Sequence, residues 1–170
     1  MPENLLRIST AVALHGRDVH PWKETTDFDF ILRFTDEIQE WQRELRDAIS
    51  PPKIDRLSDG SIKLTFPVRS TKYDESHKEP FNFSRFLADK IVGVAPVARH
   101  AEEITLVYLL TPRCKVSSAA IMTHVSGYKW LIAGKHWTAP TIEAGGLPDE
   151  VSMCVLKFEP GHRVRISGEP

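Results

Sequence analysis

The sequence predicts a single α+β domain over residues 1–170, with a largely antiparallel, strongly twisted sheet of eight to ten strands. Two helices, at about residues 36–49 and 84–93, are expected to pack against it. Several short segments alternate apolar and polar residues, which is typical of strands with one solvated face. Two others repeat apolar residues every three or four positions, as helices do. The order of these segments contains no run of β-α-β units, which disfavours a doubly wound parallel sheet.

The first third of the chain contains a change of period. Residues 5–14 are apolar enough for a first strand, and phenylalanines alternate with charged residues over 27–34, which predicts a second. Beyond this strand, apolar residues that include Trp41 recur at helical spacing. Thr35 is expected to cap that helix, and Pro51 is expected to end it.

The middle of the chain combines a hairpin, a loop and a helix. Asp59 and Gly60 lie between two alternating segments, and Asp-Gly is a strong hairpin signal because both turn positions tolerate positive φ. Residues 69–81 are polar and predict a mobile surface loop. Ser84 is a candidate cap for the second helix, which Gly93 and Pro96 would end. The nearly all-apolar segment 103–110 is typical of a strand that is buried on both faces.

The segment 116–134 fits two structures. A helix can begin at Ser117, but Ser126 and Gly127 also separate two alternating segments, which favours a hairpin. We therefore predict a hairpin here, with the helix as the alternative. Two further strands are expected at 151–158 and 163–166.

Composition limits the class of protein. The 22 Lys and Arg residues balance 23 Asp and Glu residues, so the chain is not a globally basic nucleic-acid coat. No apolar run approaches the ~20 residues that span a bilayer, and the N-terminus lacks the basic and apolar regions of an export signal. Cys114 and Cys154 form no disulfide framework and are expected to be buried thiols. The cytoplasm is the expected compartment, with no contact to a membrane.

Most catalytic signatures fail on spacing. The sequence contains no phosphate loop, no dinucleotide fingerprint and no nucleophile elbow, and its seven histidines are scattered. No catalytic residue, metal site or cofactor is therefore predicted. Two His-x-Ser/Thr motifs, at 124–126 and 136–138, could together hold a phosphate. In the predicted hairpin they lie roughly 23 Å apart, too far to hold one phosphate together.

One segment has an uneven charge distribution. Residues 104–142 contain four basic residues and no acidic one, whereas the rest of the chain has 18 basic and 23 acidic residues. Aromatic side chains lie among the basic ones, and this combination suits both single-stranded nucleic acids and protein interfaces. The aromatic residues can equally belong to the core. The candidate binding residues are Lys129, Lys135, His136, Trp137, His124, Arg113 and Lys115.

These observations favour a non-catalytic binding or regulatory protein that acts through contacts with another macromolecule, with a protein as the expected partner. The alternative is a protein that binds or processes single-stranded RNA or DNA, including a small hydrolase whose site is assembled from dispersed residues. A homo-oligomer is also compatible with the sequence.

Overall fold

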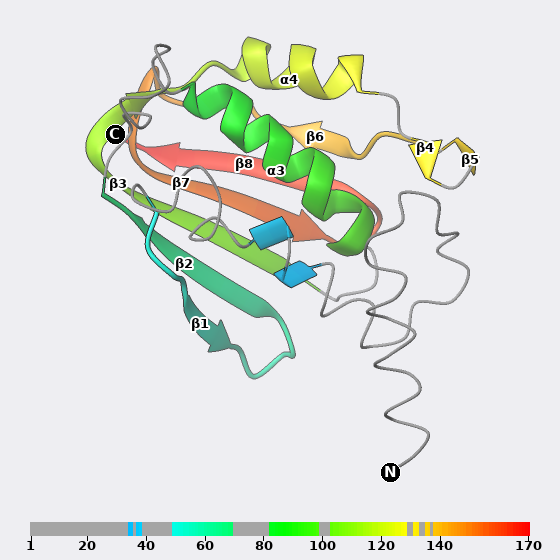
Figure 1. Cartoon of the computed structure of the whole chain (residues 1–170), viewed down its shortest axis with the longest axis horizontal. Coiled ribbons are helices and arrows are strands. Elements are labelled where there is room, and N and C mark those ends of the chain that lie inside the picture. Colours follow the sequence, from blue (N-terminus) through cyan, green and yellow to red (C-terminus); the bar gives the residue numbers. More distant parts are fainter. Residues whose placement is uncertain are drawn as a thin grey trace.

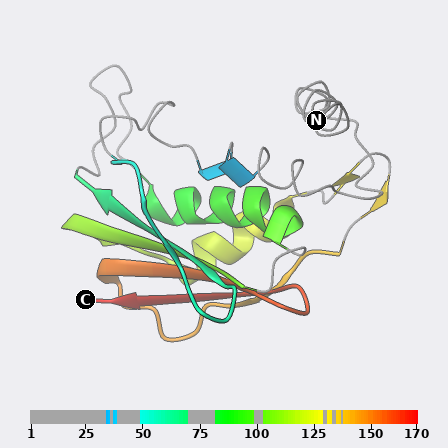
Figure 2. The ribbon, with the colours of Figure 1, turned by 90° about the horizontal axis from the view of Figure 1, so that it is seen from below.

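The computed structural model describes residues 34–35, 37–38, 49–69, 82–98, 103–128, 131–132, 135–136 and 138–170. These residues form an α+β fold in which two helices cover one face of a six-stranded sheet (Figures 1 and 2). A separate two-stranded ribbon lies beside it. In chain order the elements are β1 (Lys53–Arg56), β2 (Ile62–Val68), α3 (Phe83–Ala98), β3 (Ile104–Lys115), α4 (Ser118–Gly127), β4 (Leu131–Ile132), β5 (Lys135–His136), β6 (Thr141–Glu143), β7 (Glu150–Glu159) and β8 (Arg163–Glu169).

The α+β class is confirmed, but the predicted sheet of eight to ten largely antiparallel strands is wrong in two respects. Within the described ranges the sheet has six strands, in the order β1-β2-β3-β7-β8-β6, and it is mixed. Three neighbouring pairs are antiparallel, whereas β2 runs parallel to β3 and β6 runs parallel to β8. The parallel β2–β3 pair is possible because α3 lies between these strands in the chain and provides the crossover that a short turn cannot.

The predicted hairpin around Asp59 and Gly60 is confirmed. β1 and β2 are antiparallel, and Gly60 has the positive φ of 89° that the turn requires. The Asp59 carboxylate accepts hydrogen bonds from the Ser61 amide at 2.9 Å and the Ser61 hydroxyl at 2.5 Å. These bonds favour the ionised form, so the hydroxyl contact first and the amide contact second lower the pKa of Asp59.

The helix expected at 84–93 is confirmed but extends further in both directions. It begins after Asn82, whose side-chain oxygen accepts from the Arg85 amide at 3.0 Å, so Asn82 rather than Ser84 is the cap. Pro96 lies inside the last turn of α3 instead of ending it. The apolar stripe of Phe83, Leu87, Ile91 and Val94 is fully buried, as the helical spacing predicts.

The hairpin expected over 116–134 is wrong, because Ser118–Gly127 forms the helix α4. Ser117 caps it by accepting a hydrogen bond from the Ala120 amide at 3.2 Å. Ile121 and Val125 are the buried residues of α4. Their spacing of four fits one face of a helix and also one face of a strand, which explains the error. A short ribbon does follow, but it pairs Leu131–Ile132 with Lys135–His136.

The N-terminal predictions are tested at only a few positions. Phe34 and Thr35 are helical, so the strand expected over 27–34 does not include Phe34, and Thr35 is not a cap. Ile49 forms an isolated bridge with Val68, and the helix expected over 36–49 therefore does not reach Ile49. The rest of these segments, with Trp41, the strand at 5–14 and the loop residues 70–81, lies outside the described residues.

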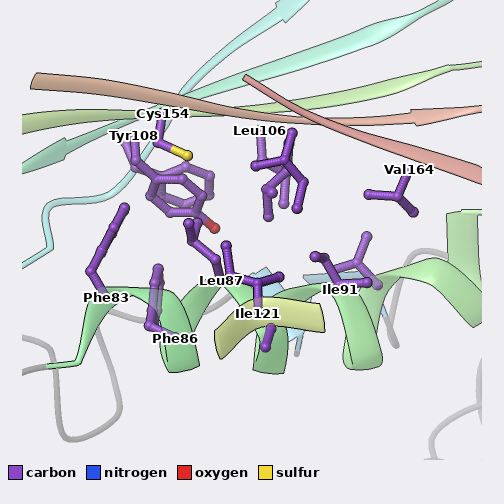
Figure 3. Packing of buried hydrophobic residues seen from close by; sticks show 14 of the residues in the cluster. Phe83, Phe86, Leu87, Ile91, Leu106, Tyr108, Ile121, Cys154 and Val164 are labelled. Carbon is purple, nitrogen blue, oxygen red and sulfur yellow. The ribbon is translucent and has the colours of Figure 1, made fainter. Parts of the chain in front are cut away.

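The core lies between the helices and the covered face of the sheet (Figure 3). Phe66 and Tyr108 stack there with ring centroids 5.1 Å apart, and the Phe86 ring meets Tyr108 edge-on. Cys114 and Cys154 are both free and buried, as expected from the sequence. Burial raises the pKa of the Cys154 thiol to about 12, so the thiol is protonated and inert. No helix in the described part of the chain is long and apolar enough to cross a membrane.

Candidate functional site

A cleft of about 860 Å³ lies at the end of the sheet where β3 ends and where α3, α4 and β7 begin. These four element ends meet at the left of Figure 1. The charged residues of its lining are Arg113, Lys115, Asp149 and Glu150. Two buried or partly exposed serines at the helix starts, Ser84 and Ser117, also line it. The cleft is therefore polar at its rim, and it is built by segments that are distant in sequence.

The cleft exists because β3 is longer than β2. The pairing between these strands ends at Val68 and Leu110, whereas β3 continues to Lys115. On its other side β3 stays paired with β7: after an irregular stretch beyond Leu109, Cys114 lies opposite Val151 and Lys115 lies opposite Glu150. The end of β3 is thus paired along one edge within the described structure.

The two helix starts are joined beside this end of β3. The Ser117 amide donates a hydrogen bond to the Ser84 hydroxyl at 2.6 Å. Ser84 lies in the first turn of α3 and is 4% exposed, and Ser117 is the cap of α4. This hydrogen bond holds the starts of α3 and α4 against the strand and gives the cleft a fixed wall.

The charges of the cleft differ from those on the uncovered face of the sheet. On that face Lys157 pairs with Glu103 at 3.0 Å, and Arg165 pairs with Glu143 at 3.2 Å. Cross-strand ion pairs of this kind are typical of a solvated sheet face. By contrast, none of the four charged residues of the cleft forms an ion pair within the described structure.

The structure brings together only two of the seven predicted binding residues. Arg113 and Lys115 are exposed at the end of β3 and line the cleft. His124 lies elsewhere, on α4, where its Nε2 atom is 2.6 Å from the Asp89 carboxylate of α3. Of the other four, Lys135 and His136 belong to β5, of which only the backbone is described, and Lys129 and Trp137 lie outside the described residues.

The His124–Asp89 contact is partly exposed, and we expect it to contribute little to stability. Replacing His124 by alanine should lower the free energy of unfolding by less than about 1 kcal/mol, because water competes for both side chains. Urea-induced unfolding of the variant at neutral pH measures this difference. A loss above about 2 kcal/mol would instead identify the contact as a main clasp between α3 and α4.

Sequence reasoning missed the acidic side of the cleft and its serines. Asp149 and Glu150 precede a predicted strand and were interpreted as ordinary loop charges. They reach the cleft only because β7 pairs with β3, and no local pattern predicts that pairing. Ser117 was recognised as a possible helix start, so the sequence did contain one signal for this site.

The described residues show binding geometry and no catalytic constellation. They contain no group of three or more His, Cys, Asp or Glu side chains that could hold a metal ion. The His-x-Ser motif at 124–126 lies on α4, where residues two apart point to different sides of the helix. His124 and Ser126 therefore do not converge on one phosphate. What the cleft offers is two cations, two carboxylates and strand backbone.

No protein-family model matches this chain, and neither does any curated protein or any solved structure. The functional argument therefore rests on the residues of the chain itself.

Proposed function

We propose that this chain is a non-catalytic binding protein that acts through contacts with another protein, and that the cleft at the end of β3 is the contact site. One observation carries the proposal: Arg113, Lys115, Asp149 and Glu150 line a cleft of about 860 Å³ without forming ion pairs among the described residues. Charges that the fold leaves unpaired in a concave site are available to a partner, and they steer its encounter and fix its register.

The charge balance of the cleft favours a protein over a nucleic acid. Two carboxylates face the same space as the two cations, so this part of the site has no net positive charge. A single-stranded nucleic acid instead needs a consistently basic groove with aromatic side chains on which bases stack. Tyr128 is exposed, but it follows the C-terminal end of α4, whereas the cleft lies at the N-terminal end of that helix.

The proposal places the protein in the cytoplasm. Its two cysteines are free and buried, one on β3 and one on β7. Free thiols are the normal state in a reducing compartment, whereas secreted domains of this size commonly use paired cysteines.

Charge reversal in the cleft tests the proposal. Proteins captured by the wild-type chain from a native extract are identified by mass spectrometry, and each is then purified and titrated by calorimetry. We expect Arg113→Glu/Lys115→Glu to weaken binding of the true partner by at least about tenfold, because both changes place a like charge at a complementary contact. Circular dichroism shows whether the variant is folded, and Arg113→Gln/Lys115→Gln is the milder substitute.

Arg56→Glu/Lys63→Glu is the matched control. Both residues are exposed on β1 and β2, near the opposite end of the sheet, and the change in net charge is the same. The control should bind the partner within about twofold of wild type. Equal losses in both variants, or none in the cleft variant, would show that the cleft is not the contact site. Capture that disappears after nuclease treatment would show that the ligand is a nucleic acid.

A further inference from the structure

The edge of β3 that borders the cleft has no strand partner between Thr111 and Lys115. β2 pairs with this edge only as far as Leu110, and no other described strand takes its place. An unpaired strand edge is a template to which another extended chain adds through main-chain hydrogen bonds. The cleft provides the space for such a chain beside the edge.

The main-chain groups of Arg113 and Lys115 point towards this open edge. On the paired side, the Val116 amide donates to the Asp149 carbonyl of β7 at 3.0 Å. Because successive residues of an extended chain direct their N–H and C=O groups to opposite sides, Lys115 and Arg113 direct theirs away from β7. Ser117 follows the same alternation: its backbone is extended, and its amide donates to Ser84 of α3.

The side chains along this edge also alternate. Arg113 and Lys115 are exposed, whereas Cys114 and Val116 are buried towards the helices. An added strand would therefore place every second side chain beside the two cations and the intervening side chains towards the apolar layer.

The two cleft carboxylates lie one strand further away from the open edge. Lys115 is directly opposite Glu150, and both Asp149 and Glu150 are on the β7 side of β3. With strands about 4.8 Å apart, an added chain lies one spacing from the cations and two spacings from the carboxylates. Its nearest charges are therefore positive, which favours acidic side chains.

We propose that β3 accepts an extended segment of the partner protein as an added strand at Thr111–Lys115, with acidic side chains at alternate positions beside Arg113 and Lys115. This inference rests on the proposed function and names the chemistry of the partner segment at the same cleft. The residues between the acids are small and apolar.

The probe is the peptide acetyl-Thr-Glu-Val-Glu-Val-Thr-amide, titrated into the isotope-labelled full chain up to about 1 mM, because a short peptide binds weakly. The amide signals of Thr111, Arg113 and Lys115 are expected to shift. Replacing both glutamates of the peptide by glutamine should weaken binding by about tenfold, since it removes the charge and keeps the shape.

Methylation of the peptide amides tests main-chain pairing without altering the protein. If the peptide adds antiparallel, the Glu amides bond to β3; if it adds parallel, the Val amides do. One peptide is methylated on both Glu amides and a second on both Val amides. We expect one of them to lose at least about tenfold in affinity while the other binds like the parent peptide.

The proposal is overturned if the parent peptide shifts no signal at Thr111–Lys115, or if the two methylated peptides bind equally well or equally poorly. These results are distinct from a failure of the proposed function. If Arg113→Glu/Lys115→Glu abolishes binding of the native partner but methylation has no selective effect, the cleft is the contact site and strand addition is wrong.

Discussion

Replacing Leu106 by alanine is expected to lower the free energy of unfolding by about 2–5 kcal/mol. Leu106 is fully buried on the face of β3 that the helices cover, opposite Leu156 of β7 (Figure 3). The change removes apolar surface from the centre of the core and leaves a cavity that rigid neighbouring strands cannot close. Denaturant-induced unfolding measures the loss.

Leu109→Ala is the matched control on the same strand. Leu109 lies on the uncovered face, opposite Met153, and is 41% exposed. The same atoms are removed, but the cost should be less than about 1 kcal/mol because no enclosed cavity is formed. Similar losses in the two variants would mean that another layer covers this face and that the assignment of inner and outer faces is wrong.

The second large effect is expected at Gly168 on β8. A Cβ atom at this position would lie 2.6 Å from a methyl group of Val151 and 3.3 Å from the Met153 carbonyl oxygen. Val151 is fully buried and β-branched, so it cannot rotate away freely. Gly168→Ala should therefore destabilise the protein by about 1–3 kcal/mol through overpacking, as measured by thermal unfolding.

Gly127→Ala provides the comparison. Gly127 is the last residue of α4, and a Cβ atom there meets nothing within 4 Å. Alanine also has the higher helix propensity, so this variant should be as stable as wild type or more stable by up to about 1 kcal/mol. A stable Gly168→Ala variant would show that β8 can move relative to the Val151 side chain.

The sequence predicted elements best where one period was unambiguous. The buried stripe of α3 and the turn at Asp59 and Gly60 could be recognised because their spacing or turn chemistry allows one interpretation. Ile121 and Val125 were misassigned because residues four apart share a face in both a helix and a strand. The capping hydroxyl of Ser117 was the better guide, since a side chain that satisfies a free amide acts only at a helix start.

The candidate site was predicted only in part, for a different reason. Arg113 and Lys115 were found through local charge, because an acid-free segment is visible in the sequence. Their neighbours Ser84 and Glu150 come from segments that precede or follow β3 by about 30 residues or more, and the fold alone brings them to the cleft. His124 belongs to the same acid-free segment, but the helix places it against Asp89.

The central position of β3 has a consequence for the order of folding. Its partners are distant in the chain: Ile104 pairs with Ile62, 42 residues earlier (104 − 62), and with Phe158, 54 residues later (158 − 104). The β1–β2 and β7–β8 pairs are closed by short turns and can form first, whereas closure of the sheet waits for these long-range contacts, which slow folding. During synthesis, the apolar segment Ile104–Leu110 is therefore made well before β7 exists to cover its second edge. In that interval the nascent chain exposes its stickiest strand, and it is then that chaperones have most to protect.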